Sequence, residues 1–252
     1  RLDRLEKETK RILQEASVIG RAFLFEILKK FTDPEQNIDR SIRGLEQLDL
    51  IRTRTLEPDL EYIFKHALTQ EVVYNGLLKK ERKEIHERIG LVMEQLFQDR
   101  LPEFYETLAF HFKQGRSAEK AVDYLMKSAE KSLKKYALEE SHLHFKEAFD
   151  LLISKSPETR EEKDLFVDLI LKWAEVYHRR GGYRGLIDLL EPHKVLVESL
   201  NDKSRLSMFY GWLGLALGSR DKLKDAYQYL CKALKFADET EDLKVSGYVC
   251  SW

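Results

Sequence analysis

The sequence predicts a mostly α-helical fold in which a small N-terminal unit with one β-hairpin precedes a solenoid of helical hairpins. Glycine and proline are scarce, with 12 and 5 residues, and 35% of all residues are charged, which is typical of long helices with a large surface. Apolar residues recur at helical spacing over most of the chain. They change to strict alternation only around residues 50–64, which indicates a pair of strands.

The first hundred residues are predicted to form three helices, a hairpin and two further helices. The expected helices cover residues 5–19, 23–31, 35–48, 67–78 and 80–97, and Pro34 is expected near the start of the third. Residues 50–55 and 60–64 alternate around a Pro58-Asp59 turn and are expected to pair as strands. Three short helices and a hairpin outline a winged helix, so we predict a winged-helix-like domain over residues 1–100.

Residues 101–252 are predicted to contain helices alone. These are expected at residues 103–114, 118–134, 138–153, 161–180, 183–199, 203–219, 223–237 and 241–252. The connections between them are short, as at Gly181-Gly182, which favours antiparallel neighbours.

A recurring order of residue sizes predicts that these helices form repeats. A small residue is followed 12 positions later by another, then by a bulky apolar residue and a further small one. The sets are Ala109, Ala121, Leu125, Ser128; Ala129, Ser141, Phe145, Ala148; Ala174, Leu186, Leu190, His193; and Gly214, Ala226, Leu230, Ala233. In the third set, Leu186 and His193 stand where small residues are expected. Small residues let two helix axes approach closely. The pattern is that of TPR repeats, so residues 101–252 are predicted to form a TPR-like α-solenoid that continues past Trp252.

A solenoid of this kind offers a concave face. First-helix side chains that point away from the core are expected to line it, namely Phe110, Met126, Glu130, Leu171, Glu175, His178, Met208 and Leu215. The face could bind a protein or peptide partner, or it could be an ordinary solvated or internally packed surface. The sequence leaves both interpretations open.

Composition disfavours several classes of function. The formal net charge is −1, and both signs are spread evenly, unlike the clustered basic excess of nucleic-acid binders. Two cysteines, Cys231 and Cys250, make neither a disulfide framework nor a zinc site, so we expect a cytoplasmic protein without a metal. No apolar run is long enough to predict a membrane span. Because no catalytic motif occurs, we expect a non-catalytic segment.

Two stretches carry a family resemblance. ASVIGRAF at residues 16–23 and FKHALTQEVVY at residues 64–74, followed by Arg82, Ile85, His86 and Ile89, resemble the region after the ATPase core in bacterial STAND-type signalling ATPases. These are predicted ATPases attached to adenylate cyclases, serine/threonine kinases or transcription activators. The order of a winged helix and then TPR repeats matches over nearly the whole chain.

The resemblance implies a regulatory segment of a larger signalling ATPase. In that family the winged helix follows a P-loop module and helps to hold its ADP-bound resting state, while the TPR array is a sensor or scaffold. The chain has no Gly-x-x-x-x-Gly-Lys-Ser/Thr pattern, so no cofactor is expected within it. ATP or ADP would belong to an ATPase domain before Arg1, which would be the intramolecular partner of the winged helix.

The resemblance also singles out His66. Related eukaryotic immune ATPases carry a Met-His-Asp motif after the winged-helix hairpin, and its histidine contacts the ADP β-phosphate. His66 aligns with that histidine, although Lys65 and Ala67 replace the methionine and aspartate. A histidine at a helix N-terminus is suited to a phosphate, because backbone amides and the imidazole N–H point toward it. The alternative is a capping or packing histidine.

The winged helix suggests a DNA-binding transcription regulator as the alternative function. Its third helix would enter the major groove with Arg40 and Arg43, and Arg52 and Arg54 on the wing would contact phosphates. The acidic residues that lie among these arginines would repel the DNA backbone; they are Asp39, Glu46, Asp49, Glu57 and Asp59. The regulatory interpretation is therefore preferred.

Overall fold

The computed structural model describes residues 5–32, 37–56, 59–154, 158–240 and 247. The chain divides into two compact units, Arg1–Tyr124 and Leu125–Trp252. The boundary that we predicted at residue 100 lies within the first unit and stays a prediction. Pro34 and the helix expected over residues 241–252 lie outside the described residues, apart from Gly247.

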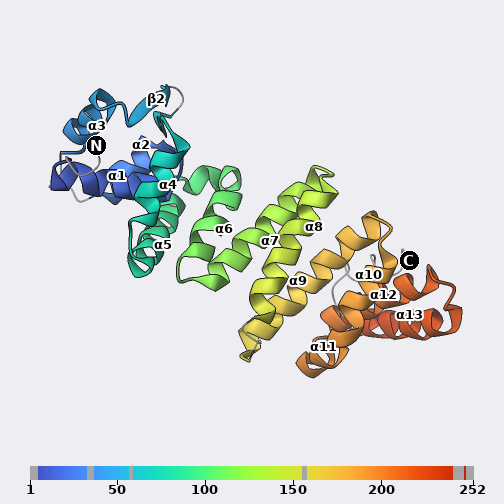
Figure 1. The fold of residues 1–252 in the computed structure, drawn as a ribbon. Helices are drawn as coiled ribbons and strands as arrows, with labels where there is room; N and C mark the ends of the chain where they lie inside the picture. The colour runs from blue at the N-terminus through green and yellow to red at the C-terminus, as the bar shows by residue number, and fades with distance from the viewer. Residues whose placement is uncertain (1–4, 33–36, 57–58, 155–157, 241–246, 248–252) are drawn as a thin grey trace. The chain divides into compact units, whose positions relative to one another are not determined.

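The first unit has the order helix, strand, helix, helix, hairpin (Figure 1). Its elements are α1 (Lys7–Ile19), β1 (Ala22–Leu24), α2 (Phe25–Phe31), α3 (Ile38–Gln47), β2 (Ile51–Thr55) and β3 (Glu61–Phe64). They are followed by α4 (Ala67–Asn75), α5 (Lys79–Leu96), η2 (Gln98–Glu103) and α6 (Tyr105–Gln114). The three helices and the strand pair predicted for this unit are confirmed, whereas their identification as a winged helix stays a prediction.

The sheet has one strand more than the predicted hairpin. It is antiparallel in the order β1-β3-β2, and Phe23 of β1 and Thr53 of β2 both pair with Tyr62 of β3. The helix expected from Phe23 therefore begins only at Phe25. A short apolar run does not distinguish strand from helix by itself. Here β3 decides, because its free edge pairs with β1 and the Phe23 ring stacks on Tyr62.

The second unit is an α-solenoid of TPR-like hairpins, as predicted. The helix α7 (Ala118–Lys134) contributes residues to both units. It is followed by α8 (Leu138–Ile153), α9 (Arg160–Arg179), α10 (Tyr183–Leu190), η3 (Glu191–His193), α11 (Lys194–Leu200), α12 (Lys203–Gly218) and α13 (Leu223–Asp238).

The helix expected over residues 183–199 is broken into three pieces, so that prediction was wrong. Pro192 lies in η3, between α10 and α11. A proline inside a helix lacks the backbone N–H and clashes with the preceding turn, which explains the break. Leu190 before it and Val197 after it are nevertheless both buried.

The spacing of small residues corresponds to close contacts between paired helices. Ser141 Oγ donates a hydrogen bond to the Ala129 carbonyl oxygen over 2.8 Å, which joins α8 to α7. At Gly214 of α12, an added Cβ would lie 2.8 Å from Leu230 Cγ and 3.1 Å from the Ala226 carbonyl oxygen of α13. At Ser141 and Gly214, the repeat pattern thus marks positions at which paired helices lie close together.

We expect Gly214→Val to lower the free energy of unfolding by about 2 kcal/mol, because the new side chain overpacks the α12–α13 contact. The control is Gly218→Ala in the same helix, where an added Cβ would make an ordinary 3.6 Å contact with Ala226 Cβ. Urea denaturation followed by circular dichroism measures both. Equal midpoints for the two variants would contradict this account of the repeat.

Candidate functional site

The second unit contains an open pocket of about 390 Å³ between α7, α8 and α9. It is lined by Glu130, Leu133, Lys134, Tyr136, Phe145, Lys172, Glu175 and Arg179. Its volume lies within the usual range for ligand pockets, about 300–1,000 Å³. We call this pocket the α7–α9 groove.

Polar contacts join α8 to α9 beside this groove, and the Ser141 hydrogen bond to Ala129 joins α8 to α7. Trp173 of α9 donates from Nε1 to His142 Nδ1 of α8 over 3.0 Å. Arg180 donates two hydrogen bonds to Glu139, of 3.0 and 2.8 Å, in the bidentate geometry that fixes direction as well as distance. Burial lowers the pKa of His142, with a smaller contribution from Arg180, and so favours the neutral ring that accepts the tryptophan N–H. The groove walls are therefore preformed.

The charges of the groove are unequal. Lys172 of α9 forms an ion pair with Glu130 of α7, and Arg179 donates two hydrogen bonds to Glu175, of 3.0 and 2.7 Å. Lys134 lines the same pocket and forms no ion pair among the described residues. Three cations face two carboxylates, which leaves one positive charge in excess.

Tyr136 connects α7 to α8 in an unusual backbone conformation. Its φ is +59°, and the corresponding turns after α9 and α12 have Gly181 at +68° and Asp221 at +58°. In each turn the next residue donates its backbone N–H to the carbonyl oxygen five positions earlier: Ala137 to Ser132, Gly182 to Tyr177, and Lys222 to Leu217. This is the Schellman helix ending, whose left-handed position glycine occupies most easily. A tyrosine there is strained, whereas glycine and aspartate are well tolerated.

The strained position directs the Tyr136 side chain to the rim of the groove. Its relative exposure is 76%, and the guanidinium carbon of Arg179 lies 5.7 Å from the ring centre. The groove therefore combines an exposed aromatic ring, a free lysine and the fully buried Phe145. Exposed tyrosine and arginine together are typical of residues that dominate protein interfaces.

Only part of the predicted concave face comes together. Glu130 and Glu175 both line the α7–α9 groove. Met126 is 5% exposed, so its prediction as a surface residue was wrong. Its helical spacing from Val122 and Ala129 places it on the same buried face of α7.

The other predicted face residues lie elsewhere. Phe110 is 47% exposed and belongs to the first unit. His178 lies 3.2 Å through Nδ1 from the Tyr183 hydroxyl and packs beside the Trp212 ring. Leu171, Met208 and Leu215 are partly exposed. Four residues that line the groove were not predicted from the sequence, namely Lys134, Tyr136, Lys172 and Arg179. Tyr136 could have been noticed, because an aromatic residue stands at a helix ending where the turn after α9 has Gly181.

His66 immediately precedes α4, at its N-terminus, as the sequence predicts. Its backbone is extended, its side chain is exposed, and that side chain makes no capping hydrogen bond to the helix. Leu68 and Val72, one turn apart on α4, are also exposed, at 69% and 52%. The neighbouring Lys65 forms an ion pair with Asp49. A phosphate-sensing role for His66 stays a prediction.

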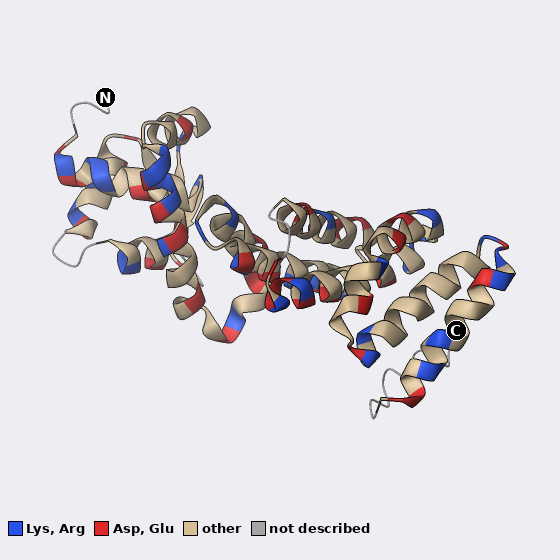
Figure 2. Cartoon of the chain, turned by 90° about the horizontal axis from the view of Figure 1, so that it is seen from below, with Lys and Arg blue, Asp and Glu red and all other residues tan. Residues whose placement is uncertain are grey.

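The arginines considered for DNA binding are exposed, but carboxylates accompany several of them. Arg54 lies 3.3 Å from Glu61, and Arg40 lies 3.9 Å from Glu6. Arg43 donates from Nε to the Asp39 carbonyl oxygen. Figure 2 shows acidic and basic segments interspersed along the described helices. The surface of α3 therefore lacks the clustered basic charge that binds a phosphate backbone.

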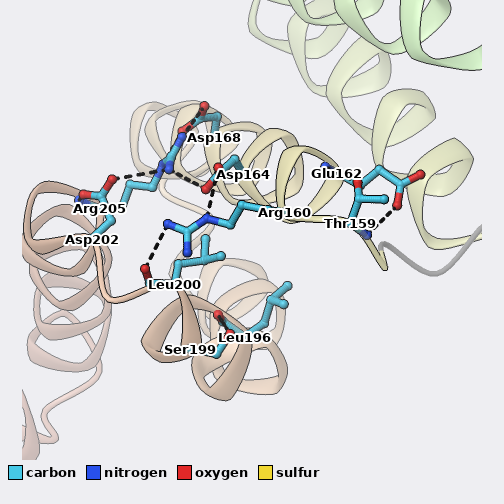
Figure 3. Close-up of polar contacts among 10 residues, drawn as sticks. All are labelled: Thr159, Arg160, Glu162, Asp164, Asp168, Leu196, Ser199, Leu200, Asp202 and Arg205. Carbon is cyan, nitrogen blue, oxygen red and sulfur yellow. Dashed lines mark hydrogen bonds and ion pairs between the residues drawn. The ribbon is translucent and has the colours of Figure 1, made fainter.

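A further polar cluster joins α9 to α12 (Figure 3). Arg205 binds both oxygens of Asp168, at 2.8 and 2.9 Å, and Asp164 at 2.6 Å. Asp202 caps α12 by accepting the Arg205 backbone N–H, and Arg160 donates to the Leu200 carbonyl oxygen. The hydrogen bonds that Arg205 donates to Asp168 raise the pKa of Arg205, so the guanidinium stays charged. Every polar group of Arg205 has a partner, which favours a structural role.

The first unit contains a buried pair of histidines. His86 of α5 and His111 of α6 lie 2.9 Å apart through their Nδ1 atoms, and His86 Nε2 lies 3.1 Å from the Tyr74 hydroxyl. Burial lowers the pKa of His86, with a smaller contribution from Arg82. Burial also lowers the pKa of His111, with a smaller electrostatic contribution from His86. Both rings are therefore neutral at pH 7, and one Nδ1–H donates to the other Nδ1.

The chain has likenesses among solved structures. No family model matches the sequence. No curated protein matches it. Among solved structures, the chain is similar to a Signal Transduction ATPase with Numerous Domains (STAND) protein with a tetratricopeptide repeat sensor from Pyrococcus horikoshii. The match has 16% identity and a TM-score of 0.42, and it covers 98% of this chain and 41% of that protein. The chain thus spans less than half the length of that protein.

Among the helices of the described residues, none has the length and apolar character needed to span a bilayer. No group of three or more His, Cys, Asp or Glu side chains among them is placed to hold a metal ion.

We expect the histidine pair to make the first unit sensitive to acid. The unfolded chain takes up protons near the ordinary histidine pKa of about 6.5, whereas the folded pair resists protonation. Stability is therefore complete above about pH 6.5 and falls as the pH decreases. Between pH 7.5 and pH 5.5, the free energy of unfolding should fall by about 2 kcal/mol because of the pair, as measured by urea denaturation. His111→Leu should remove about half of that loss; an unchanged loss would refute the assignment.

Proposed function

We propose that this chain is a non-catalytic regulatory segment of a larger STAND-like signalling ATPase, in which the solenoid binds a protein partner. The α7–α9 groove is the observation that carries this proposal. It is preformed, it is partly apolar, and it presents Tyr136 and Arg179 at an open surface. Solenoids generally bind their partners on extended surfaces of this kind.

The proposed mechanism is conformational. A partner occupies the groove, and the winged-helix-like unit acts as a latch that holds or releases an ATPase domain outside this chain. The helix α7 has residues in both units: its Tyr124 bonds Glu94 within the first, and its Glu130 pairs with Lys172 within the second. The exposed α4 surface around His66, with Leu68 and Val72, is the proposed latch contact.

A DNA-binding transcription regulator is the weaker alternative. The pairing of Arg54 with Glu61 and of Arg100 with Asp59 uses basic charge near the hairpin for contacts within the chain. Salt-dependent binding of duplex DNA by this chain would favour the alternative, and a flat titration would exclude it.

We expect His66→Ala, made in the intact ATPase, to weaken ADP retention about tenfold, because a phosphate loses an imidazole donor at a helix N-terminus. The release rate of a fluorescent ADP analogue measures this. His144→Ala, on α8, is the control and should leave release unchanged. Unchanged release from the His66 variant would exclude phosphate contact by this residue.

We also expect peptides selected on this chain from an unbiased twelve-residue display library to bind at the groove. The groove variant is Lys134→Glu/Tyr136→Gly, and the matched control is Lys222→Glu/Asp221→Gly, in the turn after α12. Selected peptides should bind the control as they bind the natural chain, and should bind the groove variant at least tenfold more weakly. Equal affinity of the selected peptides for the natural chain and for both variants would argue against the groove as the partner site.

A further inference from the structure

We propose that the α7–α9 groove recognises an acidic protein segment that carries an aromatic or aliphatic side chain, and that Tyr136 is the main recognition residue. This inference rests on the protein-binding function proposed above and names the chemistry of the partner. Three observations support it, namely the backbone of Tyr136, the balance of charge in the groove and the size of its apolar part.

The backbone conformation of Tyr136 is the first observation. The turns after α9 and α12 have the same helix ending with glycine or aspartate, so the fold does not require an aromatic residue at this position. Tyr136 is 76% exposed, so little of its surface packs against the rest of the chain. Strain retained by an exposed side chain points to a role in binding, because the surface contact of the ring with Arg179 is small beside the packing that a buried aromatic residue gains.

The charge of the groove is the second observation. Lys134 has no carboxylate partner among the described residues, while Lys172 and Arg179 each have one. A carboxylate entering the groove would meet Lys134 directly. The side chains of Lys172 and Arg179 are 49% and 40% exposed, so both can turn toward the same ligand. A basic segment would instead leave Lys134 facing a like charge.

The size and lining of the groove are the third observation. Its volume of about 390 Å³ is enough for a few side chains but not for a whole helix. Leu133 and the buried Phe145 provide the apolar part of the lining. Tyr136 stands beside the cations with Arg179 near its ring, so an apolar side chain and a carboxylate can be bound side by side. Glu130 and Glu175 disfavour the continuous phosphate chain of a nucleic acid.

The charge of the peptides selected by display tests this inference. We expect those whose binding depends on the groove to be enriched in Asp and Glu beside Trp, Tyr, Phe or Leu. The most enriched peptide, labelled with fluorescein, should bind about tenfold more weakly to Lys134→Glu in fluorescence anisotropy and should lose affinity as salt increases. Lys222→Glu is the matched control and should leave the affinity unchanged.

The possible failures are distinguishable. Groove-dependent peptides that are neutral or basic would overturn the acidic specificity and leave the proposed function standing. No groove-dependent peptide at all would overturn both. A single-stranded oligonucleotide that displaces the labelled peptide with the same dependence on Lys134 would also overturn the inference, in favour of a nucleic-acid ligand.

Tyr136→Gly separates recognition from structure. Glycine relieves the left-handed strain, so the melting temperature should rise by a few degrees. Affinity for the selected peptide should nevertheless fall at least fivefold. Asp221→Gly, at the equivalent turn, should change neither quantity by much, because aspartate tolerates this conformation. A variant that loses stability, or that keeps full affinity, would show that Tyr136 is not a recognition residue.

Discussion

The close approach of paired helices at small residues is the constraint on which the solenoid depends. Gly214 leaves no room for a Cβ beside Leu230, and Ser141 reaches the backbone of Ala129 with a hydrogen bond. Once backbones approach this closely, the core between them is filled, and long polar side chains remain on the outer faces. The α7–α9 groove follows from this arrangement, because its cations and carboxylates come from helix positions that packing does not use.

Polar contacts then fix the register of neighbouring helices, which apolar packing alone leaves undetermined. Arg205 binds two aspartates of α9, and the Arg180–Glu139 and Trp173–His142 contacts tie α9 to α8. Bidentate hydrogen bonds form only within a small range of distances and angles, so they define how α9 is aligned with its neighbouring helices. The first unit uses a different device. Its histidine pair is buried and neutral, which is compatible with a core only while the rings stay unprotonated.

Tyr136 is the position where local preference and the fold disagree. Helix endings elsewhere in the second unit follow the rule that a left-handed residue is glycine or a short polar residue. Such disagreements are expected at functional sites, because selection for binding can outweigh a modest loss of stability. The ring, Lys134 and Arg179 form a surface whose chemistry is that of an interface rather than of a core.

Most of the elements and the repeats could be predicted from the sequence alone, since periodicity and the spacing of small residues are local properties of the chain. The sequence predicted α7, α8 and their hairpin, the strand pair β2–β3, and the place of His66 before α4. It did not predict β1 or the groove. β1 pairs with β3, and Lys134 and Arg179 line one pocket, although in each case the residues lie about 40 positions apart in the chain. Only tertiary packing decides such contacts, because they depend on how distant helices and strands are brought together.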